Sequence, residues 1–311
     1  GFAALVAGLL AATGGTVTTQ QLPPGYVDPK PILDAAIQAI GNDKLTCVTL
    51  SGTAYNGAVG QQKEAGTNVD WPRPDQLANY TRTMNWQTRT MKEEFDRKPG
   101  LAPASWKYGV GWLAGPLQSQ PHQVFMLNAS DPNKPYAWHM DGAAGTPTAN
   151  EPDVAEVYPV ELWMNPHGFL KAAQMPGANP KATWRWELGE MGRDGPTAIP
   201  EKMYVVQITA PGGFKIDATI NKEHMLQRMH TLVPDPALGD LNYEHEFTNE
   251  SYIDIGNGIK FPTGWHSHEG YDDNFGAQNV SAGHNAFGGT MKRSEEHTSE
   301  LQSHHDLVCR L

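Results

Sequence analysis

The chain is poor in cysteine, in charge and in long apolar runs, and each shortage excludes a class of protein. Only Cys47 and Cys309 occur among 311 residues, which excludes a thiolate-rich zinc site. Charged residues make up 18% and the formal net charge is −11, so no nucleic-acid partner is indicated. The apolar run Phe2–Ala12 is shorter than the roughly 20 residues of a spanning helix, so no integral membrane segment is predicted.

Sequence motifs of several enzyme classes are also missing. The body of the chain shows no GxGxxG followed by an acidic residue, no Walker A, no GxSxG and no HExxH. Neighbouring carboxylates such as Glu93/Glu94 and Asp272/Asp273 are typical of solvated surfaces, and nothing marks them as acid–base partners. One disulfide between the two cysteines is arithmetically possible, but no feature of the sequence supports it. Cys47 is predicted to be a small buried hydrophobe.

The N-terminal region has the pattern of a removed leader. Residues 1–20 hold an apolar run followed by small residues, which is typical of a partial signal peptide and predicts a periplasmic or secreted protein. The alternative is a buried helix of the domain. Residues 21–29, with Pro23, Pro24 and Gly25, are predicted to be a linker.

Two helical segments stand out by their apolar spacing. In PILDAAIQAIG, apolar residues from Ile32 to Ile40 fall at helical spacing and Gly41 is a candidate C-cap. In VAEVYPVELWMNPHGFLKAAQM, Pro159 and Pro166 divide the second helix into two short pieces. Leu162, Trp163, Phe169 and Leu170 are predicted to form one apolar face.

Most of the remaining chain has the pattern of strands. YTRTMNWQTRTMKEEFDR, from Tyr80, alternates over much of its length and favours one long strand, whose charged end continues it or begins a turn. Shorter strand-like segments, separated by Pro, Gly, Asn and Asp, follow without a βαβ rhythm. The prediction is a mainly β (α+β) fold with an antiparallel sheet and a few short helices.

Aromatic residues are spread over the predicted strands, and two interpretations of them stay open. They fill the core of the domain, or they line a concave cavity for a lipid-like apolar small molecule. The residues are Trp86, Tyr136, Trp138, Trp184, Trp186, Tyr204, Phe214, Tyr243, Phe247 and Phe261.

A weak candidate metal site lies in GWHSHEGYDDN. His266 and His268 are two residues apart on a predicted strand and therefore share one face, with oxygen ligands from Glu269, Asp272 and Asp273 nearby. The alternative is an ordinary solvated strand end, since a zinc site needs three or four converging ligands. For the same reason, the pairs His224/His230 and Tyr243/His245 are predicted to be sheet surface rather than ligands.

The C-terminal residues 293–311 resemble a translated sequencing adapter. RSEEHTSELQS can be encoded by the opening of a standard library adapter, and HDLVCRL by the adapter sequence beyond a short index. This resemblance rests on the genetic code rather than on protein chemistry. It implies a single β-rich domain over residues 30–290, a detached artefactual tail over residues 291–311, and a natural chain cut short before its end.

Several stretches together resemble the N-terminal region of exported bacterial metallo-β-lactamase-fold hydrolases. These stretches are AIQAIGNDKLTCVTLSGTAYNGAVGQ, WPRPDQLANYTRTMNWQTRTMKEEFDR, VELWMNPHGFLKAA and MLQRMHTLVPDPALGDLNYEHEFTNESYIDIGNGIKFPTGWHSHEG. The region itself resembles the lipoprotein-carrier type of fold, a curved antiparallel half-barrel with helices over its concave side. The resemblance covers about residues 30–280.

This resemblance implies where catalysis would and would not lie. The family binds two zinc ions through HxHxDH, whereas here Gly270 and Tyr271 stand where Asp and His are required. His266 and His268 are therefore not expected to inherit the zinc role, and no catalytic residue or cofactor is expected in this chain. The implied function is that of an inactive accessory domain whose zinc and partner catalytic domain lie beyond it, and the alternative is a carrier for apolar ligands.

Overall fold

The computed structural model describes most of the chain between residues 25 and 297. The described residues are 25–57, 75–98, 122–142, 145–150, 158–188, 200–235, 239–247, 252–271 and 282–297. The first elements are β1 (Tyr26–Val27), α1 (Pro29–Ile40), η1 (Asn42–Lys44), β2 (Cys47–Gly57), β3 (Asp75–Asn85), β4 (Thr90–Lys98), β5 (His122–Asn128), β6 (Tyr136–Asp141), β7 (Thr148–Ala149), η3 (Tyr158–Leu162) and α4 (Pro166–Ala173). The remaining strands are β8 (Lys181–Leu188), β9 (Pro200–Thr209), β10 (Lys215–Ile220), β11 (Leu226–Asp235), β12 (Gly239–Phe247), β13 (Tyr252–Gly256), β14 (Ile259–Pro262), β15 (Gly264–Tyr271) and β16 (Ala282–His297).

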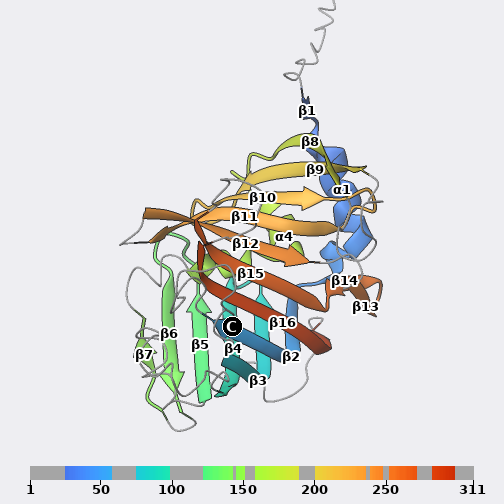
Figure 1. The fold of residues 1–311 in the computed structure, drawn as a ribbon. Helices are drawn as coiled ribbons and strands as arrows, with labels where there is room; N and C mark the ends of the chain where they lie inside the picture. Colours follow the sequence, from blue (N-terminus) through green and yellow to red (C-terminus); the bar gives the residue numbers. More distant parts are fainter. Residues whose placement is uncertain are drawn as a thin grey trace, which may run out of the picture.

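One antiparallel sheet of 14 strands dominates the molecule, in the order β1-β8-β9-β10-β11-β12-β15-β16-β2-β3-β4-β5-β6-β7. Figure 1 shows β8 to β12 running across the view and β3 to β6 running down it, so the sheet turns through a large angle from one end to the other, as the twist of adjacent strands requires. The fold is therefore mainly β, a curved half-barrel sheet with α1 and α4 as the α-helices of the described residues, and the predicted class is confirmed.

The two halves of the sheet meet where β16 pairs with β2. Their register runs from Ala286↔Gly57 to His297↔Cys47, so β16 passes the domain boundary predicted at residue 290. A long strand such as β2 presents backbone N–H and C=O groups along its edge. Any neighbouring strand can form hydrogen bonds with these groups, whether or not its residues belong to the natural protein. The adapter origin of residues 293–311 stays a prediction, and residues 298–311 lie outside the described part of the chain.

α1 matches the helix that the sequence predicts. The carboxylate of Asp28 accepts a hydrogen bond from the Lys30 N–H at 2.9 Å and caps the first turn. Gly41 ends the helix with a φ of 66°, and a Cβ at this position would lie 2.5 Å from the Gly258 carbonyl oxygen. Glycine is needed here both for the left-handed conformation and for the close approach of the chain. The segment predicted as a linker also contributes β1, which pairs with β8.

The second predicted helix is divided in two, as its prolines indicate. η3 ends at Leu162, and α4 begins at Pro166 behind Asn165, whose side chain accepts a hydrogen bond from the Gly168 N–H at 2.8 Å. Proline is favoured at this first helical position because its missing N–H would have no partner there. The predicted apolar face is confirmed, since its four residues from Leu162 to Leu170 are fully buried.

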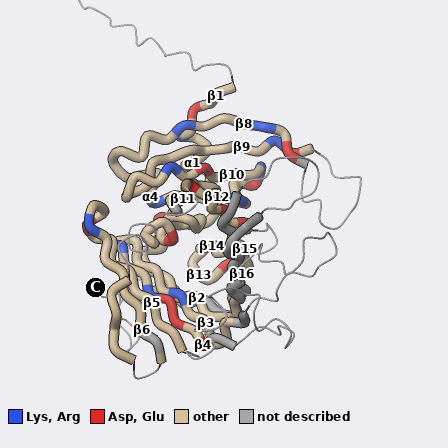
Figure 2. The backbone as a smooth tube through the Cα atoms, turned by 60° about the vertical axis from the view of Figure 1, so that its left-hand side comes forward, with Lys and Arg blue, Asp and Glu red and all other residues tan. Residues whose placement is uncertain are grey.

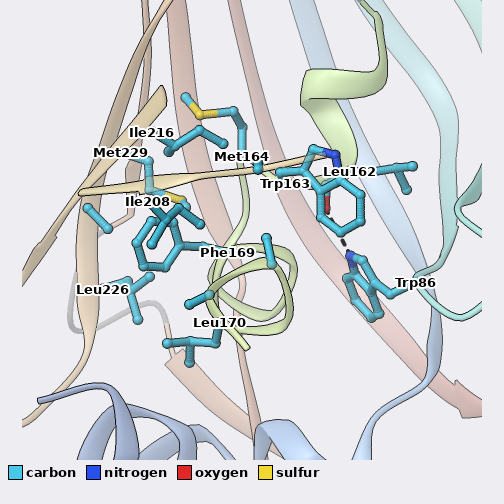
Figure 3. Packing of buried hydrophobic residues seen from close by; sticks show 14 of the residues in the cluster. Trp86, Leu162, Trp163, Met164, Phe169, Leu170, Ile208, Ile216, Leu226 and Met229 are labelled. Carbon is cyan, nitrogen blue, oxygen red and sulfur yellow. Dashed lines mark hydrogen bonds between the residues drawn. The ribbon is translucent and has the colours of Figure 1, made fainter. Parts of the chain in front are cut away.

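The helices lie inside the curve of the sheet. α1 contacts α4 and β14, and α4 contacts β9; Figure 2 shows both helices at the level of β9 to β12. Phe169 of α4 is packed with side chains of the sheet such as Ile208 and Met229 in one apolar cluster (Figure 3). The Trp86 indole N–H donates to the Leu162 carbonyl oxygen at 2.9 Å and joins the β3–β4 turn to the end of η3.

A buried histidine connects α4 to two other parts of the chain. His167 Nε2 lies 2.9 Å from the Lys260 carbonyl oxygen, and Nδ1 lies 2.9 Å from the side-chain oxygen Oδ1 of Asn42. Burial lowers the pKa of His167 from 6.5 to about 3, so the ring is neutral and has a single N–H. The Lys260 carbonyl oxygen and Asn42 Oδ1 are both acceptors, so the single N–H of the ring donates to one of these two oxygens.

The predicted single strand from Tyr80 is wrong, because β3 and β4 form a hairpin. The Asn85 side chain accepts hydrogen bonds from the N–H groups of Gln87 and Thr88, both at 3.0 Å, and Arg89 has a φ of 56°. An Asn side chain that bonds the backbone two residues ahead is a strong turn signal. It outweighs the alternation of polar and apolar residues on either side.

Cys47 is buried in β2, as expected. It is also disulfide-bonded, a bridge that the number of cysteines allows but that no feature of the sequence supports. The partner lies outside the described residues. Spacing along the sequence carries no information about such a bridge, because it depends on the distance between two Cα atoms in the fold.

Candidate functional site

A buried polar network lies between η3 and the sheet. Arg82 of β3 and Glu93 of β4 are register partners, with Arg82 Nη2 at 3.1 Å from Glu93 Oε2. Arg82 Nη1 donates to Glu161 Oε2 of η3 at 2.9 Å, and the Tyr158 hydroxyl donates to Glu93 Oε2 at 3.2 Å. The two ends of η3 are thus both bonded to the same strand pair.

The other half of the sheet contributes to the same network. The Tyr243 hydroxyl of β12 donates to Glu161 Oε1, and His245 Nε2 lies 3.0 Å from the Tyr243 oxygen and 3.8 Å from Glu161 Oε1. An N–H of His245 can therefore donate to the phenol that itself donates to the carboxylate. Glu161 joins the two halves of the curved sheet through η3.

The charges of the network are stabilised by one another. Burial acts to raise the pKa of Glu161, but the Arg82 charge, with His245 and the Tyr243 hydroxyl, lowers it below its ordinary value. Burial opposes the charge of Arg82, yet Glu93 and the other neighbours raise the pKa of Arg82 well above its ordinary value. The arginine and Glu161 are therefore both ionised at neutral pH, which is the state in which the hydrogen bond between them is strongest.

Two predictions for these residues are corrected by the structure. Glu93 was expected to be a surface carboxylate, and it is buried against Arg82. Tyr243 and His245 do share a strand face, but this face is turned toward η3 rather than toward solvent, and His245 is buried. His230 lies on the opposite face and is hydrogen-bonded to Asn242, whereas His224 lies in the β10–β11 turn with a φ of 63°.

A pocket of about 700 Å³ opens beside this network. Its walls come from the β5–β6 connection, the β9–β10 turn, β11 and Pro159 of η3. Pro159 directly follows Tyr158, and Thr231, another wall residue, is the register partner of Tyr243. The network thus holds in place two walls of the pocket.

The β9–β10 turn shapes one side of this pocket. Gly212 and Gly213 have φ values of 92° and 86°, and a Cβ on Gly212 would lie 2.6 Å from the Phe214 ring. The tight turn therefore sets the position of Phe214 in the pocket wall. Leu232 adds an apolar side chain that is 51% exposed.

Polar groups stand at the same pocket. Gln207 Nε2 donates to Asp217 Oδ1 at 3.0 Å, and the Thr231 hydroxyl donates to the Lys215 carbonyl oxygen at 2.8 Å. Lys215 and His230 also line the wall. A wall with an apolar part and a few convergent polar groups is typical of small-molecule sites.

The predicted aromatic set is divided among three environments. Trp86, Phe247 and Phe261 are buried in the core, and Tyr204, Phe214 and Tyr243 pack against it. Tyr136, Trp184 and Trp186 are exposed, and Trp138 is half-buried. The core interpretation therefore holds for most of them. The concave face under α4 is filled by the protein's own side chains, and only Phe214 lines the pocket.

His266 and His268 lie on β15, as the sequence predicts. They pair in register with Glu246 and Glu244 of β12, but their side chains are outside those that the structure describes, as are Asp272 and Asp273. Among the described residues, no group of three or more His, Cys, Asp or Glu side chains is arranged to hold a metal ion. The metal site stays a prediction.

No helix in the described parts of the chain has both the length and the apolar character needed to cross a membrane.

Comparison with known proteins gives matches of fold at low identity. No protein-family model and no curated protein matches the chain, so the resemblance to metallo-β-lactamase-fold hydrolases finds no support there. A DUF1329 family protein from Desulfovibrio piger superposes with a TM-score of 0.45 and 8% identity, over 88% of this chain and 96% of that one.

Two further structures superpose over similar lengths. A domain from Vibrio parahaemolyticus that is assigned to outer membrane lipoprotein sorting gives a TM-score of 0.43 and 9% identity, over 91% of this chain and 98% of that one. A LolA superfamily protein from Nitrosomonas europaea gives 0.40 and 11%, over 88% and 96%. At these values the function of the chain has to be argued from its own residues.

Proposed function

We propose that the chain is a binding module for a lipid-like small molecule, which enters the pocket beside η3. The observation that carries this proposal is the pocket of about 700 Å³, since small-molecule sites commonly occupy about 300–1,000 Å³. Its walls combine the Phe214 ring and the Leu232 side chain with polar groups on β10 and β11. Such a wall suits an amphiphile, with an apolar chain on one side and a polar group on the other.

The polar network supports this proposal by holding the pocket in shape. Pro159 is held between Tyr158, bonded to Glu93, and Glu161, bonded to Arg82. A wall that is fixed before binding reduces the entropy lost when a ligand binds. The network thus positions a binding surface, and the proposal assigns no chemistry to it.

An exported location is part of the same proposal. It is supported by the apolar run at Phe2–Ala12, which lies outside the described residues. A carrier of amphiphiles outside the cytoplasm would be exported by such a leader.

A fluorescent fatty acid tests the function. Titration of the full chain with dansyl-undecanoic acid should give saturable binding that unlabelled palmitate displaces. Leu232→Asp should weaken this binding at least about tenfold, because a carboxylate in the apolar wall is costly beside an acyl chain. Native mass spectrometry after mild purification should also show a co-purified lipid.

Ile253→Asp is the matched control. Ile253 is 46% exposed on the separate β13–β14 hairpin, so the same substitution there should leave probe binding unchanged. The proposal fails if the probe does not bind saturably, or if Leu232→Asp and Ile253→Asp bind it equally well.

A further inference from the structure

A second surface lies where β8 meets β9, and its residues are not among those that line the pocket. We call it the Trp platform, and it consists of Trp184, Trp186, Lys202 and Tyr204. The two tryptophans are two residues apart on one strand and share a face, and they pair in register with Tyr204 and Lys202. Trp186 is 63% exposed and Trp184 38% exposed. Large apolar side chains gathered in this way on a surface mark an interaction site.

The ring geometry narrows the kind of partner. The Trp184 and Trp186 rings are perpendicular, at 86° with centroids 6.3 Å apart. The Lys202 amine lies over the Trp184 ring, 4.9 Å from its centroid, and 5.1 Å from the centroid of Tyr204. The platform therefore offers no pair of coplanar ring faces, which disfavours a stacked sugar or base as its partner.

The charge on the platform itself is positive. Lys202 is the charged residue of β8 and β9 that shares a face with the two tryptophans, since Lys181, Arg185, Glu187 and Glu201 alternate with them and lie on the opposite face. Glu187 is paired with Arg185 and with Arg228 of β11, and Glu201 is paired with Lys222. Within the described residues, no carboxylate pairs with Lys202. In Figure 2 the Lys and Arg positions along β8 and β9 lie at the top of the sheet.

We infer that the Trp platform docks the protein onto an anionic phospholipid bilayer. Indole rings partition to the headgroup level of a membrane because they combine an apolar body with one N–H. The Lys202 stem can lie along these rings while its amine reaches the phosphates, and this cation is attracted to an anionic surface even in a chain of net charge −11. The platform lies on β8 and the first part of β9, so this inference does not rest on the proposed pocket ligand.

Vesicle sedimentation tests this inference. The full chain is mixed with vesicles of phosphatidylcholine alone, or with about one-third phosphatidylglycerol, at low salt and at high salt. It should sediment with the anionic vesicles and be released by salt. The variant Trp184→Ala/Trp186→Ala should lower the partition coefficient at least about tenfold, and Lys202→Glu should lower it by a smaller factor. Tyr136→Ala is the control, since Tyr136 is 56% exposed on β6 in the other half of the sheet.

Four outcomes would overturn the inference. In the first, the wild type does not sediment with vesicles, and in the second, the wild type and the double variant bind vesicles equally. In the third, the wild type binds both vesicle types equally. In the fourth, the wild type is an oligomer and the double variant is a monomer, but the two bind vesicles to the same extent. If the double variant does not fold by circular dichroism, Trp186→Ala and Lys202→Glu carry the test, since both side chains lie at the surface. Titration with the dansyl probe in the absence of vesicles measures ligand binding in the pocket alone. A failure of membrane docking can therefore be told apart from a failure of the pocket proposal.

Discussion

α4 and η3 cover the same concave sheet, yet different chemistry attaches each of them. α4 is held by apolar side chains such as Phe169 and Leu170, which are fully buried against the strands. η3 is held by the carboxylate of Glu161 and the hydroxyl of Tyr158. Their partners are the charged groups of Arg82 and Glu93 on one half of the sheet and the Tyr243 hydroxyl on the other.

The difference separates stability from positioning. Apolar burial stabilises in proportion to area and needs no particular orientation. A buried ion pair gains little net free energy because its desolvation is costly, but its geometry is specific. We therefore expect α4 to supply most of the stability and η3 to set the shape of the pocket wall at Pro159.

The largest effect is expected at α4. Phe169→Ala should lower the free energy of unfolding by about 4 kcal/mol, through lost transfer free energy and the cavity left behind. Urea denaturation followed by circular dichroism measures this change. Ile253→Ala, at an exposed position, should change stability by less than about 0.5 kcal/mol. A loss below about 1 kcal/mol for Phe169→Ala would contradict the assignment of α4 as the main apolar anchor.

A smaller and pH-dependent effect is expected at η3. Arg82→Met should cost about 3 kcal/mol at pH 7.5, because two buried carboxylates lose their cation. The cost should shrink toward pH 5, since without Arg82 burial raises the pKa of Glu161, which can then take up a proton. The double variant Arg82→Met/Glu161→Gln should recover part of the loss. An identical cost at both pH values would show that Arg82 acts through packing alone.

The smallest effect, the acid sensitivity of α4, sharpens the comparison further. The pKa of His167 is 6.5 when unfolded and about 3 in the native state, so between these values the unfolded chain binds more protons. The free energy of unfolding should therefore fall as the pH falls below about 6.5. Each pH unit between the two pKa values lowers it by about 1.4 kcal/mol, so the loss should be about 2 kcal/mol at pH 5.

Denaturation midpoints from pH 7.5 to pH 5 measure this dependence. His167→Gln should be less stable at pH 7.5 but should have a flatter dependence than the wild type, because the titrating ring is gone. His230→Gln, at a half-buried position on the opposite face, should keep the wild-type slope. Equal slopes for the wild type and His167→Gln would refute the role of His167.

One part of the candidate site was within reach of sequence reasoning. The Asn85 turn signal predicts a hairpin, and the register Asn85↔Thr90 then brings Arg82 opposite Glu93. An opposite-charge pair directly across two strands is a recognisable stabilising unit. The alternation of residues hid the turn, and so the pair was missed. Glu161 gave no such signal, since it lies 79 residues from Arg82 along the chain.

The amino-acid sequence by itself determined the local elements of this protein. The cap at Asp28, the ending at Gly41 and the division of the second helix at Pro166 each depend on residues within one helical turn. Short-range hydrogen bonds and restricted dihedral angles act within a few residues and do not depend on the tertiary surroundings. The ends of these elements can therefore be predicted from the sequence.

Only the tertiary structure decided which faces are buried together. The contact of His167 with the Lys260 carbonyl joins residues 93 positions apart, and the pocket draws its walls from four separate segments. These contacts exist because the twist of a long antiparallel sheet bends its two halves around η3 and α4. A curvature summed over 14 strands cannot be read from any single one of them.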